Sequence, residues 1–161
     1  MRTSVVREVS AMRLSAIVLA ALLGLLGSWA SAAATMPDPS LTPTEVVRIQ
    51  LEALRANDEA DRGIEVAFRF ASPANRDMTG PLPRFARMIK AGPYALMLRY
   101  LRFTVDAEAV DGDVALVRVT LIGADESIGY VFQLSRQRAA PFERCWMTDA
   151  VSVHAGTGRA A

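Results

Sequence analysis

The chain has 161 residues, with 18 basic and 17 acidic side chains, a single histidine and a single cysteine. This near-neutral balance gives no electrostatic basis for binding nucleic acid or an anionic membrane surface. One cysteine excludes an intramolecular disulfide, and one histidine excludes a histidine-rich metal site. We therefore expect neither a metal nor another cofactor.

Residues 1–32 predict a cleavable secretory signal peptide. Three arginines precede an apolar run over 14–26, and Ala30-Ser31-Ala32 fits the small-residue rule for a cleavage site. An uncleaved membrane anchor is the alternative, but a spanning helix needs about 20 apolar residues and this run is shorter. Cleavage leaves 15 basic and 16 acidic residues and a net charge of −1. We expect an exported bacterial protein, periplasmic or secreted, that is not attached to the membrane.

The mature chain begins with a polar, proline-rich stretch over 33–41, which predicts a flexible arm. Thr42 and Glu45 then match a capping box, with Pro43 at the first helical position. Apolar residues follow at spacings of three and four. This pattern predicts a helix that ends near Asn57.

Two further helices are predicted before the sequence changes its periodicity. One covers 63–71 and ends at Ser72-Pro73, because proline disfavours helical geometry in the residue before it. The other covers 83–90. Residues 75–83 are expected to form a loop, and 94–98 a further helical turn.

From Tyr100 onward, apolar and polar residues alternate, which predicts strands with one buried face. Hairpin turns are predicted at 111–113 and 123–125, a fourth strand over 144–153, and a frayed tail over 155–161. The inward rows of the first three strands are Leu101, Phe103, Val105 and Ala107; Ala115, Val117, Val119 and Leu121; and Ile128, Tyr130, Phe132 and Leu134. The element order predicts one α+β domain over 42–154, with three N-terminal helices on one face of a four-stranded antiparallel sheet.

Three parts of the sequence carry a resemblance to a known family: 42–58, 70–76 with 79–81, and 145–149. They are similar to the family catalogued as domain of unknown function 4864. That family resembles the nuclear transport factor 2-like superfamily, in which a strongly curved sheet wraps around helices to make a cone with an internal pocket. The resemblance implies this fold but no activity, because the superfamily includes isomerases, dehydratases, carriers and dimerising domains.

Asn75 and Arg76 are candidate ligand-binding residues between the second and third helices. Arginine pairs bidentately with carboxylate or phosphate, so the two could hold an anionic or carbonyl ligand. The structural alternative is that Asn75 closes a turn while Arg76 ties the loop to a strand.

Asp149 shares the parity of an apolar row in the fourth strand, so its carboxylate is expected to face the interior. There it could act as a general base in a pocket, which makes it the candidate catalytic residue. It could equally accept hydrogen bonds as a structural group, with Arg76 as the first partner to test.

Two aromatic residues complete the pocket candidates. Tyr130 could line the pocket or simply fill the core, whereas Trp146 has the opposite parity to its apolar row and is expected under a loop or at a dimer face. Cys145 lacks a nearby base, and His154 lies at opposite parity near the chain end. A nucleophilic Cys-His pair is therefore not expected.

These observations leave three hypotheses for function. The first is a non-enzymatic module that binds a small apolar ligand or a protein partner. The second is an isomerase-type or hydrolase-type enzyme that uses Asp149 with Arg76 or Tyr130 in the pocket. The third is a homodimerising structural domain, suggested by an outer sheet row of Val114, Leu116, Val131 and Trp146 that is more apolar than solvent favours.

Overall fold

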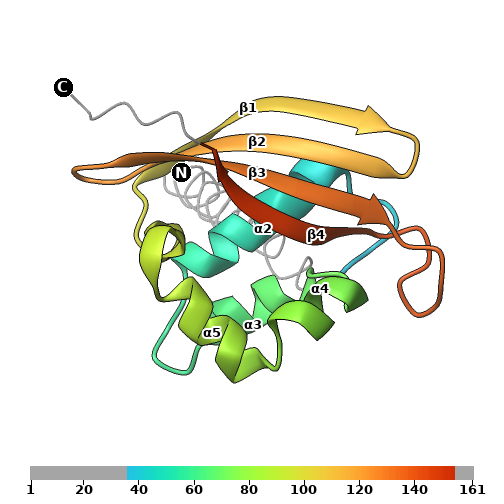
Figure 1. The fold of residues 1–161 in the computed structure, drawn as a ribbon, viewed down its shortest axis with the longest axis horizontal. Helices are drawn as coiled ribbons and strands as arrows, with labels where there is room; N and C mark the ends of the chain where they lie inside the picture. The colour runs from blue at the N-terminus through green and yellow to red at the C-terminus, as the bar shows by residue number, and fades with distance from the viewer. Residues whose placement is uncertain (1–35, 155–161) are drawn as a thin grey trace, which may run out of the picture. The chain divides into compact units, whose positions relative to one another are not determined.

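The computed structural model describes residues 36–154, in which helices are followed by strands, as the sequence predicts. The helices are α2 (Pro43–Arg55), α3 (Arg62–Arg69), α4 (Pro73–Thr79), α5 (Leu82–Ile89) and the 3₁₀ helix η2 (Gly92–Leu98). The strands are β1 (Arg102–Asp111), β2 (Val114–Ile122), β3 (Ser127–Arg136) and β4 (Trp146–His154). They form one antiparallel sheet in the order β1-β2-β3-β4 (Figure 1). The α+β class and the four-stranded sheet are confirmed.

Two predicted segments, the signal peptide over 1–32 and the tail over 155–161, lie outside the described residues. Within residues 36–154, no helix is long and apolar enough to cross a membrane. Residues 38–41 form a turn, in which the Asp38 carboxylate accepts hydrogen bonds from the Ser40 N–H at 2.8 Å and from the Ser40 hydroxyl at 2.6 Å. Leu41 packs against the core.

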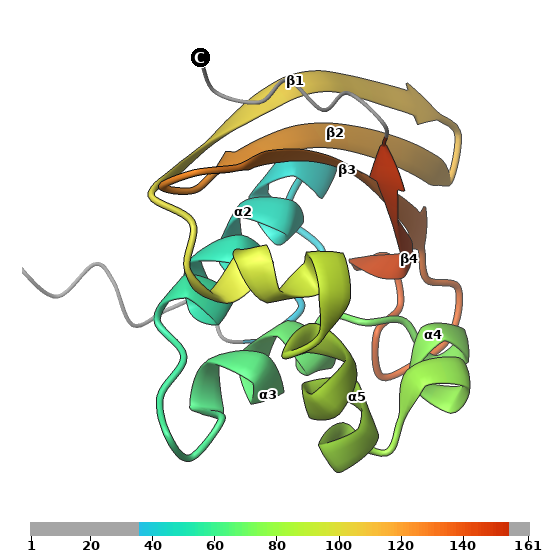
Figure 2. The same cartoon turned by 60° about the vertical axis from the view of Figure 1, so that its left-hand side comes forward.

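The first helix begins where the capping box predicts. Thr42 Oγ1 accepts a hydrogen bond from the Glu45 N–H at 3.3 Å, and the Glu45 carboxylate accepts one from the Thr42 N–H at 2.7 Å. Pro43 follows in the first turn, where a missing N–H leaves no partner unsatisfied. One face of α2 packs against the sheet that arches over it (Figure 2). The buried residues of α2 beyond Pro43 are Val46, Val47, Gln50, Leu51 and Leu54.

The predicted loop over 75–83 is wrong, because most of it belongs to helices α4 and α5. Ser72 caps α4 by accepting a hydrogen bond from the Asn75 N–H at 3.2 Å, and Pro73 occupies the first turn. The Ser72-Pro73 pair therefore starts a helix as well as ending the preceding one. The described residues thus hold four α-helices and one 3₁₀ helix, where the sequence predicts three helices and a further turn.

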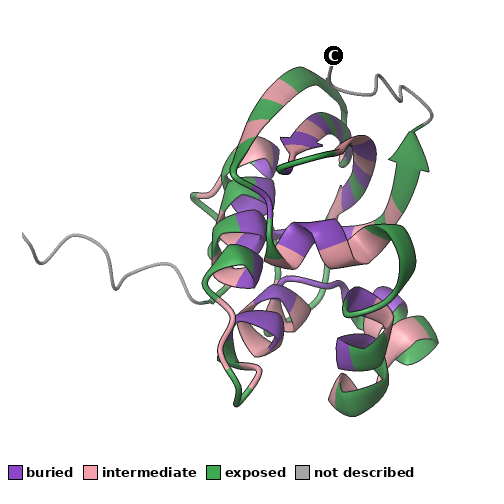
Figure 3. Cartoon of the chain, turned by 90° about the vertical axis from the view of Figure 1, so that its left-hand side faces the viewer, coloured by how far each residue is buried: buried purple, intermediate pink, exposed green. Residues whose placement is uncertain are grey.

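The core lies between the helices and the inner face of the sheet. The inward rows predicted for β2 and β3 are buried, apart from the half-buried Ile128. Their largest members are Leu121, Tyr130, Phe132 and Leu134, and burying such a side chain contributes about 1.5–3 kcal/mol. Figure 3 shows the buried residues on the sides of the elements that face one another.

β1 departs from simple alternation after Val105. The pairing with β2 shifts there, so Asp106 is an extra residue, and its carboxylate accepts a hydrogen bond from the Thr120 hydroxyl at 2.6 Å. Ala107, predicted to face inward, is therefore exposed. Leu101, also predicted to face inward, precedes the strand and is 59% exposed.

A second irregularity interrupts β4. Leu134 of β3 pairs with Thr148, whereas the adjacent Gln133 pairs with Ala150, so Asp149 is an extra residue in β4. Such a bulge reverses the inward and outward positions on its two sides. Trp146, predicted on the outer row, is accordingly buried in the core at 3% exposure.

Candidate functional site

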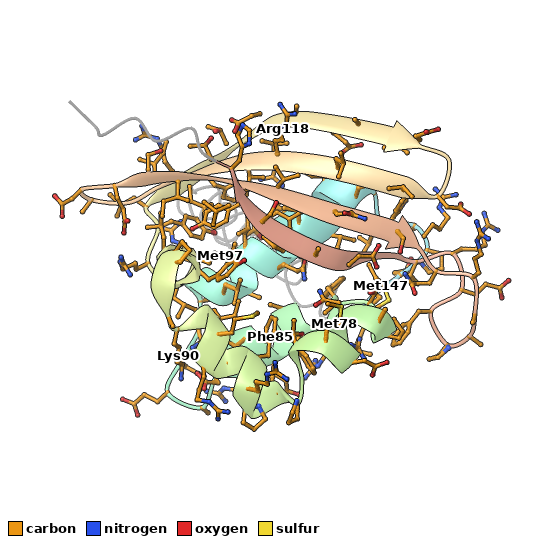
Figure 4. All side chains as sticks on the ribbon, viewed as in Figure 1. Met78, Phe85, Lys90, Met97, Arg118 and Met147 are labelled. Carbon is orange, nitrogen blue, oxygen red and sulfur yellow. The ribbon has the colours of Figure 1, made fainter. Side chains whose placement is uncertain are left out.

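A cavity of about 200 Å³ lies between the helices and strands β3 and β4. All four α-helices and η2 contribute to its wall, and Phe132 and Val151 contribute from the sheet. Met78, Phe85 and Met97 lie on the helical side of the sheet (Figure 4). Met78 is 75% exposed, which places it at the mouth.

The wall toward α5 and η2 is apolar. Phe85, Ile89 and Met97 are buried there, and the half-buried Met88 and Tyr94 complete it. Three of the cavity residues are methionines, whose unbranched side chains adapt to occupants of different shape. This part of the cavity suits an apolar group.

The wall toward α4 and β4 carries a chain of hydrogen bonds that polar side chains form with one another and with backbone carbonyls. Thr148 Oγ1 donates to Gln50 Oε1 at 2.7 Å, and Gln50 Nε2 donates to the carbonyl of Ala67 at 3.0 Å. Asn75 Nδ2 donates to the carbonyl of Thr148 at 2.9 Å, and Thr79 Oγ1 donates to the carbonyl of Asn75 at 2.8 Å. Groups held by two or more partners keep a fixed direction, so this wall is rigid and polar.

The backbone between α3 and α4 explains why this wall forms. Ala71 pairs with Thr148 in a parallel bridge, which brings a short extended segment alongside β4. The Ser72 N–H donates to the Thr148 carbonyl at 2.8 Å, and the Thr148 N–H donates to the Phe70 carbonyl at 2.9 Å. The start of α4, with Asn75 on it, is thereby fixed beside the bulge of β4.

Asp149 is a half-buried residue that lies on this bulge and borders the cavity. Among residues 36–154, no side chain forms a hydrogen bond or an ion pair with its carboxylate. It is also the one charged residue among the described residues that line the cavity. The site therefore combines an apolar wall, a fixed polar wall and an unpaired carboxylate.

Of the residues predicted as site candidates, Asn75 and Asp149 border this cavity and Arg76 does not. Arg76 Nε donates to the carbonyl of Ala71 at 2.9 Å, and its guanidinium lies 5.2 Å from the Phe142 ring centroid and 5.7 Å from that of Phe68. Partial burial lowers the pKa of this guanidinium. The predicted pairing of Arg76 with Asp149 is not formed, because Arg76 ties the loop of Phe142 to the end of α3 instead.

The aromatic candidates Tyr130 and Trp146 are core residues that do not border the cavity. The Tyr130 hydroxyl donates to the carbonyl of Pro93 at 2.5 Å, and burial raises its pKa. The Trp146 ring lies 4.8 Å from the guanidinium of Arg136. The tyrosine that does line the cavity is Tyr94, whose hydroxyl donates to the carbonyl of Val151 at 3.0 Å.

The polar side chains of the wall that were not predicted as site candidates are Gln50, Thr79 and Thr148. Gln50 falls within the apolar face of α2, and a polar side chain in such a row is a signal that could have marked it. Thr148 gives no comparable signal, because its inward direction depends on the bulge at Asp149.

The part of the chain that forms the helices and the sheet matches a known protein family. The model of the family described as "Domain of unknown function (DUF4864)" matches residues 39–161. The chain belongs to this family. No curated protein and no solved structure matches the chain significantly. Since the description of DUF4864 gives no activity, function must be argued from the site.

Within residues 36–154, the lone cysteine and the acidic side chains do not form a second site. Cys145 is buried, and that burial raises the pKa of its thiol, which disfavours the thiolate a nucleophile needs. In the described part of the chain, no three His, Cys, Asp or Glu residues gather as metal ligands. The cavity is therefore the candidate functional site.

Proposed function

We propose that this domain binds a small, mostly apolar molecule in the cavity without transforming it. The observation that carries the proposal is the division of the cavity into an apolar wall and a fixed polar wall. Small-molecule sites are built in this way, with a few directed polar groups in a largely apolar pocket.

Two further considerations support a binding role. The resemblance to the nuclear transport factor 2-like superfamily implies an internal pocket between sheet and helices, and the cavity has that position. The predicted signal peptide implies that the ligand is met outside the cytoplasm. We therefore propose an exported ligand-binding domain of nuclear transport factor 2-like fold.

An enzyme centred on Asp149 is the alternative, and the contacts of the cavity favour binding over it. A general base needs a second group that holds or polarises the substrate. The hydroxyl proton of Thr148 is already donated to Gln50 Oε1, and one of the two N–H groups of Asn75 Nδ2 is donated to the Thr148 carbonyl. Arg76 and Tyr130, the other expected participants, do not border the cavity.

Native mass spectrometry of the purified protein tests the proposal, with a cavity-filling variant as its partner. Val151 borders the cavity, so Val151→Phe fills part of it. Val153→Phe is the matched control, because Val153 lies on the same strand but is 41% exposed and does not border the cavity. We expect a bound small molecule in the wild type and in V153F but not in V151F. An identical ligand signal in V151F would refute the proposal.

A second candidate function is homodimerisation through the outer face of the sheet. Val114 and Leu116 are 46% and 43% exposed on this face, although Trp146 no longer contributes to it and the exposed Arg118 interrupts it (Figure 4). We propose a dimer that Leu116→Glu dissociates. Light scattering at micromolar concentration tests this, and a monomeric mass for the wild type would contradict it.

A further inference from the structure

The polar wall of the cavity offers more hydrogen-bond acceptors than donors. Asn75 Oδ1 receives only a 3.3 Å contact from the Thr79 hydroxyl, whose proton is directed to the Asn75 carbonyl at 2.8 Å. An amide oxygen has two lone pairs, so Asn75 Oδ1 keeps capacity for a further donor. The Asp149 carboxylate accepts hydrogen bonds only and has no partner among residues 36–154. This end of the cavity suits a group with several N–H donors.

The charge of the cavity also favours a ligand with positively charged N–H donors. Asp149 is its one charged residue, and the described residues that line it include no lysine, arginine or histidine. Arg76, which the sequence offers as a positive partner for Asp149, instead donates hydrogen bonds to backbone carbonyls and lies over two aromatic rings. An anionic ligand would meet like charge without compensation, whereas a cation would be attracted to the Asp149 carboxylate.

We propose that the ligand is a cationic amine with an apolar body. The ammonium lies between the Asp149 carboxylate and Asn75, and the apolar body extends along Phe85, Met88 and Met97 toward η2. A cavity of about 200 Å³ suits a body of roughly eight to ten non-hydrogen atoms, since a cavity of about 150 Å³ is known to hold benzene. This inference rests on the proposed binding function and adds the charge and size of the ligand to it.

Three probes that share a phenyl ring on a short alkyl chain test the charge preference. They are 2-phenylethylamine, which is cationic at pH 7, the neutral 2-phenylethanol and the anionic phenylacetate. We expect titration calorimetry to give at least tenfold tighter binding for the amine than for the alcohol, equivalent to about 1.4 kcal/mol. Phenylacetate is expected to bind more weakly than either.

Asp149→Asn is the decisive variant, because it keeps the size of the side chain and removes its charge. Asp149 has no hydrogen-bond partner in the described range, so this change should leave folding intact. We expect D149N to bring the amine within about twofold of the alcohol. Asp77→Asn is the matched control: Asp77 is an exposed carboxylate on α4 that does not border the cavity, and its removal should leave the selectivity unchanged.

The outcomes separate this inference from the proposal on which it rests. Binding of the alcohol or of phenylacetate as tightly as the amine overturns the cationic ligand, as does amine binding that D149N leaves unchanged. In either case the binding function stands if V151F still abolishes binding and V153F does not. Absence of binding by all three probes at millimolar concentration also overturns the inference, and the native mass spectrum then decides the binding function independently.

Discussion

Thr148 and Gln50 form a buried hydrogen bond that shapes the polar wall of the cavity. Thr148 Oγ1 lies 2.7 Å from Gln50 Oε1, and neither residue is more than 5% exposed. Thr148→Val preserves the shape of the side chain but leaves Gln50 Oε1 buried without a donor. A buried polar group without a partner costs about 1–3 kcal/mol. For a domain of this size we expect the melting temperature to fall by roughly 4–12 °C.

Combining this change with Gln50→Leu tests whether the cost comes from the unpaired group. The double variant removes both partners, and the Ala67 carbonyl that loses Gln50 Nε2 still accepts a hydrogen bond from the Phe70 N–H at 3.2 Å. We expect it to be less destabilised than the sum of the two single variants by about 1 kcal/mol or more. Such coupling is the mark of a direct pair.

Thr120→Val is the matched control for this cycle. Its hydroxyl donates to the exposed Asp106 carboxylate at 2.6 Å, where water can replace the lost donor, so we expect a cost below about 0.5 kcal/mol. Urea unfolding followed by circular dichroism gives the free energies of unfolding. The reasoning is refuted if the effects of T148V and Q50L are additive within about 0.3 kcal/mol, or if T148V costs no more than T120V.

Two further predictions concern stability away from the cavity. Thr42→Ala removes one half of the capping box, so the free energy of unfolding measured in urea should fall by about 1 kcal/mol. Thr42→Ser keeps the hydroxyl and should retain most of the stability. Burial raises the pKa of Tyr130 above the ordinary value of about 10. Below pH 10 this tyrosine is neutral in both the folded and the unfolded chain, so its contribution to the free energy of unfolding is fully present. Above pH 10 the unfolded chain ionises this tyrosine while the folded chain does not, and the free energy of unfolding should fall as pH rises. Tyr130→Phe should make the free energy of unfolding less dependent on pH above pH 10, but only in part, since burial also raises the pKa of Tyr100. An unchanged dependence on pH would contradict the role given to Tyr130.

Much of the fold could be predicted because its signals are local. The capping box at Thr42 and the apolar alternation of β2 and β3 each depend on residues close together in the sequence. The α4 helix could not, because Ser72-Pro73 fits the end of one helix and the start of another equally well. The two bulges could not either, since an extra residue in a strand has no distinct local pattern and is recognised only from the partner strand.

The candidate site was predicted in part, and for reasons that differ between its residues. Asn75 is a candidate because it lies between the second and third predicted helices, and the cap at Ser72 places it against β4. Asp149 was chosen by strand parity, but it reaches the cavity as the extra residue of a bulge. The partnership of Gln50 with Thr148 joins residues from opposite ends of the domain, which no spacing rule connects.

The bulge gives the cavity two kinds of polar residue with different consequences for mutation. Because the bulge at Asp149 reverses the inward and outward positions of β4, the Thr148 side chain points inward and bonds to Gln50. This part of the polar wall therefore belongs to the folded core, and its loss lowers stability. The same bulge leaves the Asp149 carboxylate without a partner among residues 36–154, so folding does not depend on its charge. A carboxylate that forms no hydrogen bond or ion pair with the described residues is available to a ligand. If the proposed amine binds there, D149N should alter binding without altering unfolding, whereas T148V should lower the free energy of unfolding.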